Sequence, residues 1–256
     1  MTSSFYDELA ESYHLIFDDW DATIRRQRDV LARLLPAPPQ GKRVLDCACG
    51  IGTQAIGLAM LGFTVEASDT CNASIHRARR EAAARGLKVE FRVDDMRKLS
   101  TAPIDAYDAV IAMDNAIPHL ESDQDIRGAL AAMRDRLRNG GTVLISLRDY
   151  GSLIAQRATS TPPLLYQDGQ FRRIVHQIWD WQDDRHYVVH LFITRELLEG
   201  WDTRHFVGRY RAIPPSDVAV LARNAGFHNV RVLAPQETGY YQPVIRAVAP
   251  SAPSSG

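Results

Sequence analysis

The sequence lacks a surplus of either charge: 30 Lys and Arg residues stand against 31 Asp and Glu in a chain of 256, a formal net charge of −1. Nucleic acids and anionic membranes are bound through basic surfaces, so this balance disfavours both as partners. The chain also lacks an apolar run near the ~18 residues that cross a bilayer, and its acidic start, MTSSFYDELAE, has no signal-peptide core. We therefore expect a cytoplasmic protein that binds neither nucleic acid nor a membrane, as a monomer or a homo-oligomer.

Cysteine is scarce as well. The three cysteines, Cys47, Cys49 and Cys71, are an odd number, and the C-x-C spacing of the first two differs from the spacing of zinc ligands. We expect three reduced packing residues and no metal site.

A glycine turn at residues 43–57, RVLDCACGIGTQAIG, is what the sequence does have. Its apolar start predicts a short buried strand, Gly50 and Gly52 allow a tight turn, and a helix begins at Thr53. Such a turn also serves dinucleotides, whose pyrophosphate rests on the helix N-terminus. Asp46 at the strand end argues against a phosphate and for a cationic ligand. On this stretch alone, an NAD site and a plain structural turn stay open.

A second acid follows the next predicted strand, FTVEASD at residues 63–69. Asp69 lies 19 positions after Gly50, which matches the ~20-residue spacing of an acid that binds ribose hydroxyls. The sequence therefore predicts an adenosine derivative as the ligand.

Strand and helix patterns alternate from Gly41 to Arg148. The expected strands are 43–48, 63–68, 88–93, 107–112 and 142–147, and the expected helices are 53–61, 71–85 and 122–138. Parallel strands need such crossovers, so the pattern predicts an α/β, Rossmann-like fold with its ligand at the carboxyl ends of the strands. That edge carries Asp46, Asp69, Asp95, Met113, Asn115, His119 and Arg148.

Beyond Asp149 the pattern changes to that of antiparallel strands. Residues 171–181 and 185–197 predict a hairpin with 203–213 as its third strand. A helix at 215–226 and strands at 228–234 and 241–248 then complete the larger sheet. Ahead of the core, residues 5–35 predict two helices, the second with Asp21 as its N-cap.

With DCACGIG, FTVEASD, YDAVIAMDNAIPHL and RNGGTVLISLRDY in this order, the chain resembles the class I methyltransferases that depend on S-adenosylmethionine (SAM). More narrowly, it resembles the glycine N-methyltransferase group and bacterial small-molecule N-methyltransferases, including those of the toxoflavin (azapteridine) type. The resemblance implies SAM as cofactor, S-adenosylhomocysteine (SAH) as product, and a mostly parallel seven-stranded sheet whose last strand is inserted antiparallel.

It also implies a division of the chain: an N-terminal helical lid at 1–40, the SAM-binding core at 41–150, an antiparallel cap over the active site at 151–213, and a helix and strands completing the core at 214–249. A proline- and serine-rich tail, 250–256, is expected to be disordered.

The cofactor residues implied by the resemblance come from the lid, the turn and the strand ends: Tyr13, Trp20, Arg26, Asp46, Ala48, Gly50, Gly52, Asp69, Thr70, Asp95, Met96 and Met113. In the family an arginine of the second helix clamps the methionine carboxylate, and Arg26 is the best match, with Arg25 as the rival. Asp95 is expected at the adenine amino group, with Asp94 as the alternative, and Met96 against the base.

The substrate residues expected are Tyr6, Asn115, His119, Arg148, Tyr166, Trp179, Trp181, Phe192 and Tyr240, with Tyr6, His119 and Arg148 as the catalytic set. His119 suits either a proton acceptor or a structural role. Arg148 matches the family arginine that receives a glycine carboxylate, while Phe192 replaces a family tyrosine.

The chemistry implied is an in-line methyl transfer to nitrogen, which depends on alignment more than on a general base. An aromatic cap suits a flat ring, so we expect a heterocyclic nitrogen, as in an azapteridine. A glycine or sarcosine N-methyltransferase and a non-catalytic SAM-binding protein are the alternatives.

Overall fold

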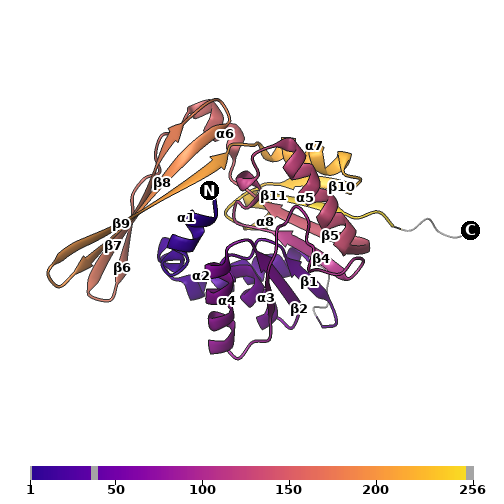
Figure 1. The fold of residues 1–256 in the computed structure, drawn as a ribbon, viewed down its shortest axis with the longest axis horizontal. Coiled ribbons are helices and arrows are strands. Elements are labelled where there is room, and N and C mark those ends of the chain that lie inside the picture. Colours follow the sequence, from indigo (N-terminus) through magenta and orange to yellow (C-terminus); the bar gives the residue numbers. More distant parts are fainter. Residues whose placement is uncertain (1, 36–39, 252–256) are drawn as a thin grey trace, which may run out of the picture.

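The computed structural model describes residues 2–35 and 40–251, which form two sheets. The larger has the order β10-β11-β5-β4-β1-β2-β3, and the smaller, antiparallel throughout, has the order β6-β7-β8-β9 (Figure 1). In the larger sheet β11 lies between β5 and β10 and runs antiparallel to both. The predicted Rossmann-like, mostly parallel seven-stranded sheet with an antiparallel last strand is confirmed.

The larger sheet consists of β1 (Arg43–Asp46), β2 (Thr64–Asp69), β3 (Glu90–Val93), β4 (Tyr107–Ala112), β5 (Leu137–Ser146), β10 (His228–Leu233) and β11 (Val244–Val248). The helices around it are α2 (Trp20–Leu34), α3 (Thr53–Met60), α4 (Asn72–Ala84), α5 (Asp123–Arg136) and α7 (Pro215–Asn224).

Two apolar layers cover this sheet because side chains alternate along each strand. Val44 of β1 and Ile111 of β4 pack with α2, α3 and α4. Leu45 and Val110, one residue away on the same strands, pack with α5 and α7, and this second layer continues into the smaller sheet. With both faces covered, the carboxyl ends of the strands remain as the edge where a ligand can reach the sheet.

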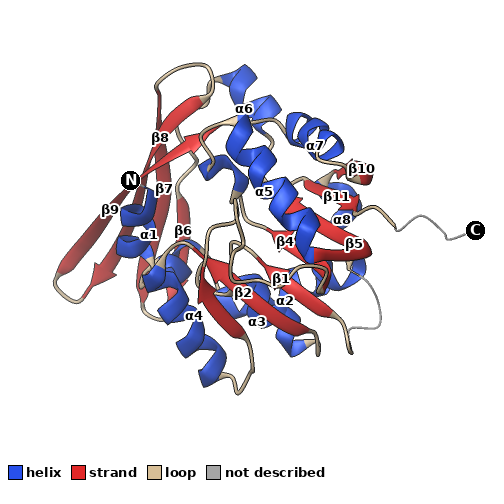
Figure 2. Cartoon of the chain, turned by 45° about the vertical axis from the view of Figure 1, so that its right-hand side comes forward, coloured by secondary structure: helices blue, strands red, loops and turns tan. Residues whose placement is uncertain are grey.

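The smaller sheet consists of β6 (Leu164–Asp168), β7 (Phe171–Trp181), β8 (His186–Leu197) and β9 (Gly200–Arg211). Figure 2 shows it standing beside the core with α1 (Thr2–Leu9) between them. Helix α1 approaches β9 closely because Gly208 has no side chain: a Cβ there would lie 3.2 Å from the ring of Phe5. The N-terminal segment is thus wedged between the two sheets.

Several local expectations were incomplete or wrong. The N-cap of α2 is Asp19, whose carboxylate accepts from Ala22 N at 2.9 Å, and not Asp21. A 3-10 turn, η1 (Tyr13–Ile16), separates α1 from α2, and β6, α6 (Tyr150–Gln156) and α8 (Pro235–Thr238) were not expected. Strand β5 begins earlier than expected, at Leu137. The expected disordered tail falls mostly outside the described residues. Among those described, no helix has the length and apolar character that crossing a membrane requires.

Candidate active site

A cavity of about 450 Å³ opens at the carboxyl ends of β1 to β4. It is lined by Tyr6, Tyr13, Ala48, Cys49, Gly50, Thr53, Gln54, Asp69, Thr70, Cys71, Asp95, Met96, Arg97, Met113, Asp114, Ala116, His119, Leu120, Glu121 and Asp125. Of the residues expected at the site, the cavity brings together Tyr6, Tyr13, Ala48, Gly50, Asp69, Thr70, Asp95, Met96, Met113 and His119. The N-terminal segment, the glycine turn and the strand ends therefore meet at one place.

Asp69 is fixed at the end of β2 by two backbone amides. Its Oδ2 accepts from Gly50 N and its Oδ1 from Cys71 N, both at 2.9 Å. Gly50, at φ +52°, turns its amide toward the carboxylate. Burial raises the pKa of Asp69, and the hydrogen bonds from the amides oppose that rise. The carboxylate is thus held rigidly where it lines the cavity.

Asp95 lies at the far end of the cavity, paired with a cation. The Arg97 guanidinium contacts its carboxylate at 2.6 Å and reaches Asp125 at 3.2 Å. The hydrogen bond from Arg97 lowers the pKa of Asp95. Asp94, the alternative, instead accepts from the amide and hydroxyl of Thr101 at 2.7 Å and does not line the cavity. Because the hydrogen bonds of Asp94 hold the loop, the structure favours Asp95 as the residue that contacts the ligand.

Asp46 lies beneath the turn, fully buried and outside the cavity lining. Its Oδ1 is 3.4 Å from Ala48 N, and its Oδ2 has no hydrogen-bond partner among the described residues. Burial, together with the neighbouring Asp69 and Asp114, raises the pKa of Asp46 to about 8. A buried carboxyl with a free oxygen suits a cationic ligand.

The charge of the cavity wall also favours a cationic ligand. Within the described lining, five carboxylates stand against the single guanidinium of Arg97: Asp69, Asp95, Asp114, Glu121 and Asp125. A pyrophosphate would be repelled here, whereas the sulfonium and ammonium of SAM fit. The dinucleotide alternative loses its support.

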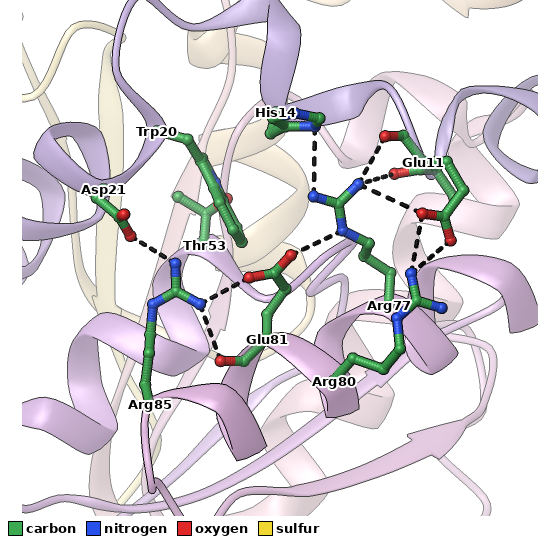
Figure 3. A network of polar contacts seen from close by, with 10 residues as sticks. Glu11, His14, Trp20, Asp21, Thr53, Arg77, Arg80, Glu81 and Arg85 are labelled. Carbon is green, nitrogen blue, oxygen red and sulfur yellow. Dashed lines mark hydrogen bonds and ion pairs between the residues drawn. The ribbon is translucent and has the colours of Figure 1, made fainter.

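Besides Asp46, three expected cofactor residues lie outside the cavity lining. Gly52, at φ +95°, lets α3 approach α4, because a Cβ there would lie 3.3 Å from Ala78 Cβ. Trp20 donates from Nε1 to Thr53 Oγ1 at 2.9 Å, and the guanidiniums of Arg77 on α4 and of Arg85 at its C-terminal end lie near its ring (Figure 3). Arg26 is exposed, and among the described residues its side chain bonds to Thr23 of its own helix alone. Arg25 is exposed too, since the buried stripe of α2 presents Gln27 to the site instead.

Asp114, which the sequence analysis did not single out, is the centre of a buried network. It accepts from the hydroxyls of Tyr240 and Tyr241, the latter at 2.8 Å, and from Gln54 Nε2 at 2.7 Å. Its backbone is in the left-handed region, φ +55°, which bends the chain sharply as β4 ends. The signal in the sequence was a polar residue just after a predicted strand, but the residues predicted for the site were its neighbours.

Asn115 is such a neighbour, and it does not line the cavity. Its Nδ2 donates to Tyr150 Oη at 3.0 Å, and its Oδ1 accepts from Arg148 N at 3.1 Å. The side-chain amide therefore joins the ends of β4 and β5. Tyr240 is likewise buried, and its hydroxyl contacts Asp114 and, at 3.4 Å, Gln54, both of which line the cavity.

Tyr6 and His119 both line the cavity and contact each other there. Tyr6 Oη lies 2.8 Å from His119 Nε2 and 3.4 Å from Tyr210 Oη. Burial lowers the pKa of His119 to about 4, so the imidazole is neutral at pH 7. Its Nε2 is thus already engaged in a hydrogen bond with Tyr6.

Arg148 lies beside the cavity rather than in its wall. Its guanidinium lies 5.0 Å from the Trp179 ring centre, Nη2 donates to Gln177 Oε1 at 3.1 Å, and buried Nη1 lacks a partner among the described residues. It lines a second hollow of about 680 Å³ together with Tyr241, Gln242 and several prolines. Tyr241 joins the two hollows through its bond to Asp114.

None of the four cap residues expected at the substrate lines the cofactor cavity. Trp179 and Trp181 pack on Tyr187, and Tyr166 lies under Arg173. Phe192 is on the outer face of β8, stacked between His176 and His205. Alternation along β8 turns it away from Leu191 and Ile193, which face the core. The aromatic groups near the centre are tyrosines instead: Tyr6, Tyr13, Tyr150, Tyr187, Tyr210 and Tyr241.

Comparison with known proteins agrees with this geometry. Residues 44–141 match the family described as "Methyltransferase domain". Glycine/sarcosine N-methyltransferase of Parasynechococcus marenigrum (strain WH8102) is 32% identical over 157 residues, 60% of this chain and 55% of that protein. Ubiquinone biosynthesis O-methyltransferase of Methylocella silvestris is 37% identical over 109 residues, 43% of this chain and 41% of that protein. The chain thus spans about half the length of the curated relatives it matches.

A solved structure extends the likeness to the whole fold. The CcbJ methyltransferase from Streptomyces caelestis superposes with a TM-score of 0.78 over 98% of this chain and 100% of that one, at 21% identity. At such identity the likeness concerns the fold alone. Together with the family match and the acid-lined cavity at the strand ends, it leads to the conclusion that this chain carries a class I SAM-dependent methyltransferase domain.

Proposed function

We propose that the protein transfers the methyl group of SAM to a nitrogen of a small molecule. The observation that carries this is the acid-lined cavity where the strands end, with Asp69, Asp95 and Asp114 in its wall. When bound there, SAM supplies a methyl group activated by its sulfonium. The similarity to a protein named glycine/sarcosine N-methyltransferase supports nitrogen as the acceptor atom.

The choice of nitrogen over oxygen has a second support. A neutral amine attacks without a general base, whereas a phenol or alcohol must lose a proton. The imidazole at the cavity, His119, is neutral, and its Nε2 already shares a hydrogen bond with Tyr6. The similarity to an O-methyltransferase of ubiquinone biosynthesis makes oxygen the second candidate.

Each group of residues has a part in this proposal. Asp69 binds the ribose hydroxyls, Asp95 and Met96 hold the adenine, and the free oxygen of Asp46 lies on the side of the cationic groups. Tyr6 and Tyr13 cover the cofactor from the N-terminal segment and exclude water. Alignment of the reactants at about 3 to 3.5 Å supplies several kcal/mol toward the barrier.

The acceptor lies, in this proposal, in the second hollow beside Arg148, because Tyr241 belongs to its wall and bonds to Asp114. The azapteridine expectation stays a prediction, without the support of Phe192, Trp179 and Trp181, which do not face the cavity. The carboxylate of Asp114 favours an amine that attacks in its neutral form, because it can stabilise the positive charge that develops on the nitrogen as the methyl group is transferred.

Incubation of the purified protein with methyl-labelled SAM tests the acceptor class. The panel contains glycine, sarcosine, amino sugars, an azapteridine and a phenol. We expect label on an amine nitrogen. Label on the phenol alone would contradict the choice of nitrogen, and SAH binding without any labelled product would favour a non-catalytic SAM-binding protein.

Substitution of Asp69 by alanine tests the cofactor site. The change removes a rigid carboxylate from two ribose hydrogen bonds, so we expect a loss of about 1.5 to 3 kcal/mol, roughly ten- to a hundredfold in the Kd of SAM. Calorimetry with SAM and NAD measures it, with the exposed Glu199→Ala as the control. Tighter binding of NAD than of SAM by the unmodified protein would refute the assignment.

A further inference from the structure

The segment between α1 and α2, residues 10–18, is held from two sides through its backbone carbonyl groups, and we call it the strap. It carries Tyr13, which lines the cofactor cavity, and it follows α1, which carries Tyr6. Two arginines, one on the core helix α4 and one on the cap strand β7, donate to the carbonyl oxygens of five strap residues: Ala10, Glu11, Leu15, Phe17 and Asp18.

The first arginine, Arg77, holds the strap from the core. It lies on α4 with its side chain 9% exposed, and its Nη1 donates to Ala10 O at 3.3 Å and Glu11 O at 2.6 Å (Figure 3). Its Nη2 is 3.3 Å from His14 Nδ1, and its Nε contacts Glu81 at 2.9 Å. Burial lowers the pKa of His14, so the imidazole is neutral and accepts from the guanidinium.

The second arginine, Arg173, holds the strap from the cap. It lies on β7 and is 2% exposed. Its Nη1 donates to Leu15 O and to Phe17 O, the latter at 3.1 Å, and its Nη2 to Asp18 O at 3.4 Å. Asp168 balances its charge with contacts at 2.7 and 2.8 Å.

Both clamps depend on the shape of the guanidinium. Burying an arginine carries a desolvation cost, which these two offset by directing several donors in a fixed plane at neutral carbonyls. Because the bonds go to backbone atoms, they fix the path of the strap whatever its side chains are. The position of Tyr13 over the cavity therefore depends on a residue of the core and on a residue of the cap.

We propose that Arg77 and Arg173 are positioning residues that fasten the strap over the cofactor, so that the cap sheet controls how long the cofactor stays bound. The proposal rests on the SAM site of the proposed function but not on the identity of the acceptor. Release of the product SAH requires the strap to leave at least one clamp. A weakened clamp on either side then speeds release.

The test compares Arg77→Lys and Arg173→Lys with two controls that leave the strap untouched. Arg79→Lys is on α4 and donates to Phe91 O, and Arg172→Lys is on β7 and pairs with Glu196. Lysine keeps the charge but loses the fork, so each clamp variant should release SAH about ten- to a hundredfold faster in stopped-flow displacement. The KM for SAM should rise about as much while kcat changes less than about threefold, and both controls should stay within about twofold of the unmodified protein.

Hydrogen exchange separates a loosened strap from a loosened protein. In the clamp variants we expect the strap amides to exchange at least about tenfold faster and to lose their protection by SAH, while β4 amides keep theirs. SAH release within about twofold of the unmodified protein, or equal loss of protection in the strap and in β4, would overturn the proposal. Absence of SAH binding by the unmodified protein would overturn it together with the cofactor site, whereas faster SAH release from the clamp variants without any methylated amine would overturn the proposed function alone.

Discussion

Replacement of Asp46 by asparagine is expected to make the cofactor-free protein more stable and to remove most of its affinity for SAM. The carboxyl is fully buried, and its Oδ2 has no partner among the described residues. Asparagine keeps the shape without the charge. The same substitution thus improves the empty site and damages the occupied one.

The sign and the pH range follow from the pKa. In the unfolded chain an aspartate titrates near ~4, whereas burial raises the pKa of Asp46 to about 8 in the fold. Between these values the folded state binds the extra proton, so its stability falls as the pH rises. The penalty is complete near pH 8, where it amounts to roughly 3 to 5 kcal/mol before the cost of burying the new amide, about 1 to 3 kcal/mol, is subtracted.

Chemical denaturation between pH 4 and 8 measures this effect. We expect the free energy of unfolding of Asp46→Asn to exceed that of the unmodified protein by about 2 kcal/mol at pH 8 and the advantage to vanish toward pH 4. The exposed Asp202→Asn serves as the control. A stability difference independent of pH would contradict the assigned pKa.

SAM binding is expected to change the protonation of Asp46. A cation near the free oxygen lowers the pKa of Asp46, so binding should release a proton, and the heat of binding should depend on the ionisation enthalpy of the buffer. In Asp46→Asn that dependence should disappear along with at least about 2 kcal/mol of binding free energy. Retained affinity would show that Asp46 has no part in holding the cofactor.

Substitution of Asp114 is expected to have the largest effect on turnover. Its carboxylate accepts from Tyr240, Tyr241 and Gln54, and after its removal the buried donors of Tyr240 and Gln54 share Gln27 Oε1 as their acceptor. A hydrogen bond to a charged group contributes about 1.5 to 3 kcal/mol, so Asp114→Ala should lose roughly 3 to 5 kcal/mol of stability, part of it from the left-handed backbone that alanine disfavours.

Asp114→Asn isolates the charge from the backbone, because asparagine tolerates the left-handed region. We expect it to fold and to lower kcat by about a hundredfold or more, since the acceptor amine loses its carboxylate and the tyrosines lose their anchor. Tyr241→Phe is the matched control: it removes one bond of an exposed tyrosine and should cost less than about 1 kcal/mol. Steady-state kinetics and urea denaturation measure both quantities. A kcat for Asp114→Asn within threefold of the unmodified value would exclude a role for the charge.

The sheet and its ligand edge were predictable because their signals are local. The glycine turn, the acid at the end of β2 and the alternation of helix and strand each lie within a few residues of one another. They indicated a parallel α/β sheet and placed Asp69 and Gly50 correctly at the cavity.

Contacts between distant segments were not predictable in the same way. Gln27 faces the site and Arg26 does not, because α2 turns its buried stripe toward the sheet, where Gln27 meets Gln54 and Asp114. Along β8, Leu191, Phe192 and Ile193 are all apolar, so the sequence does not tell which of them face the core. The antiparallel strands of the cap were predicted correctly, whereas the cap side chains predicted at the substrate do not line the cofactor cavity.

The antiparallel placement of β11 has a consequence for synthesis on the ribosome. β10 has no partner among the described strands except β11, which also pairs with β5. Because β10 emerges first, it waits with an unpaired edge until residues 244–248 follow, and unpaired edges invite association with other chains. Tyr240 and Tyr241 emerge only just before β11, so the Asp114 network also closes late. A nascent chain halted before residue 240 would hold most of the cofactor cavity but neither the finished sheet nor the anchored carboxylate.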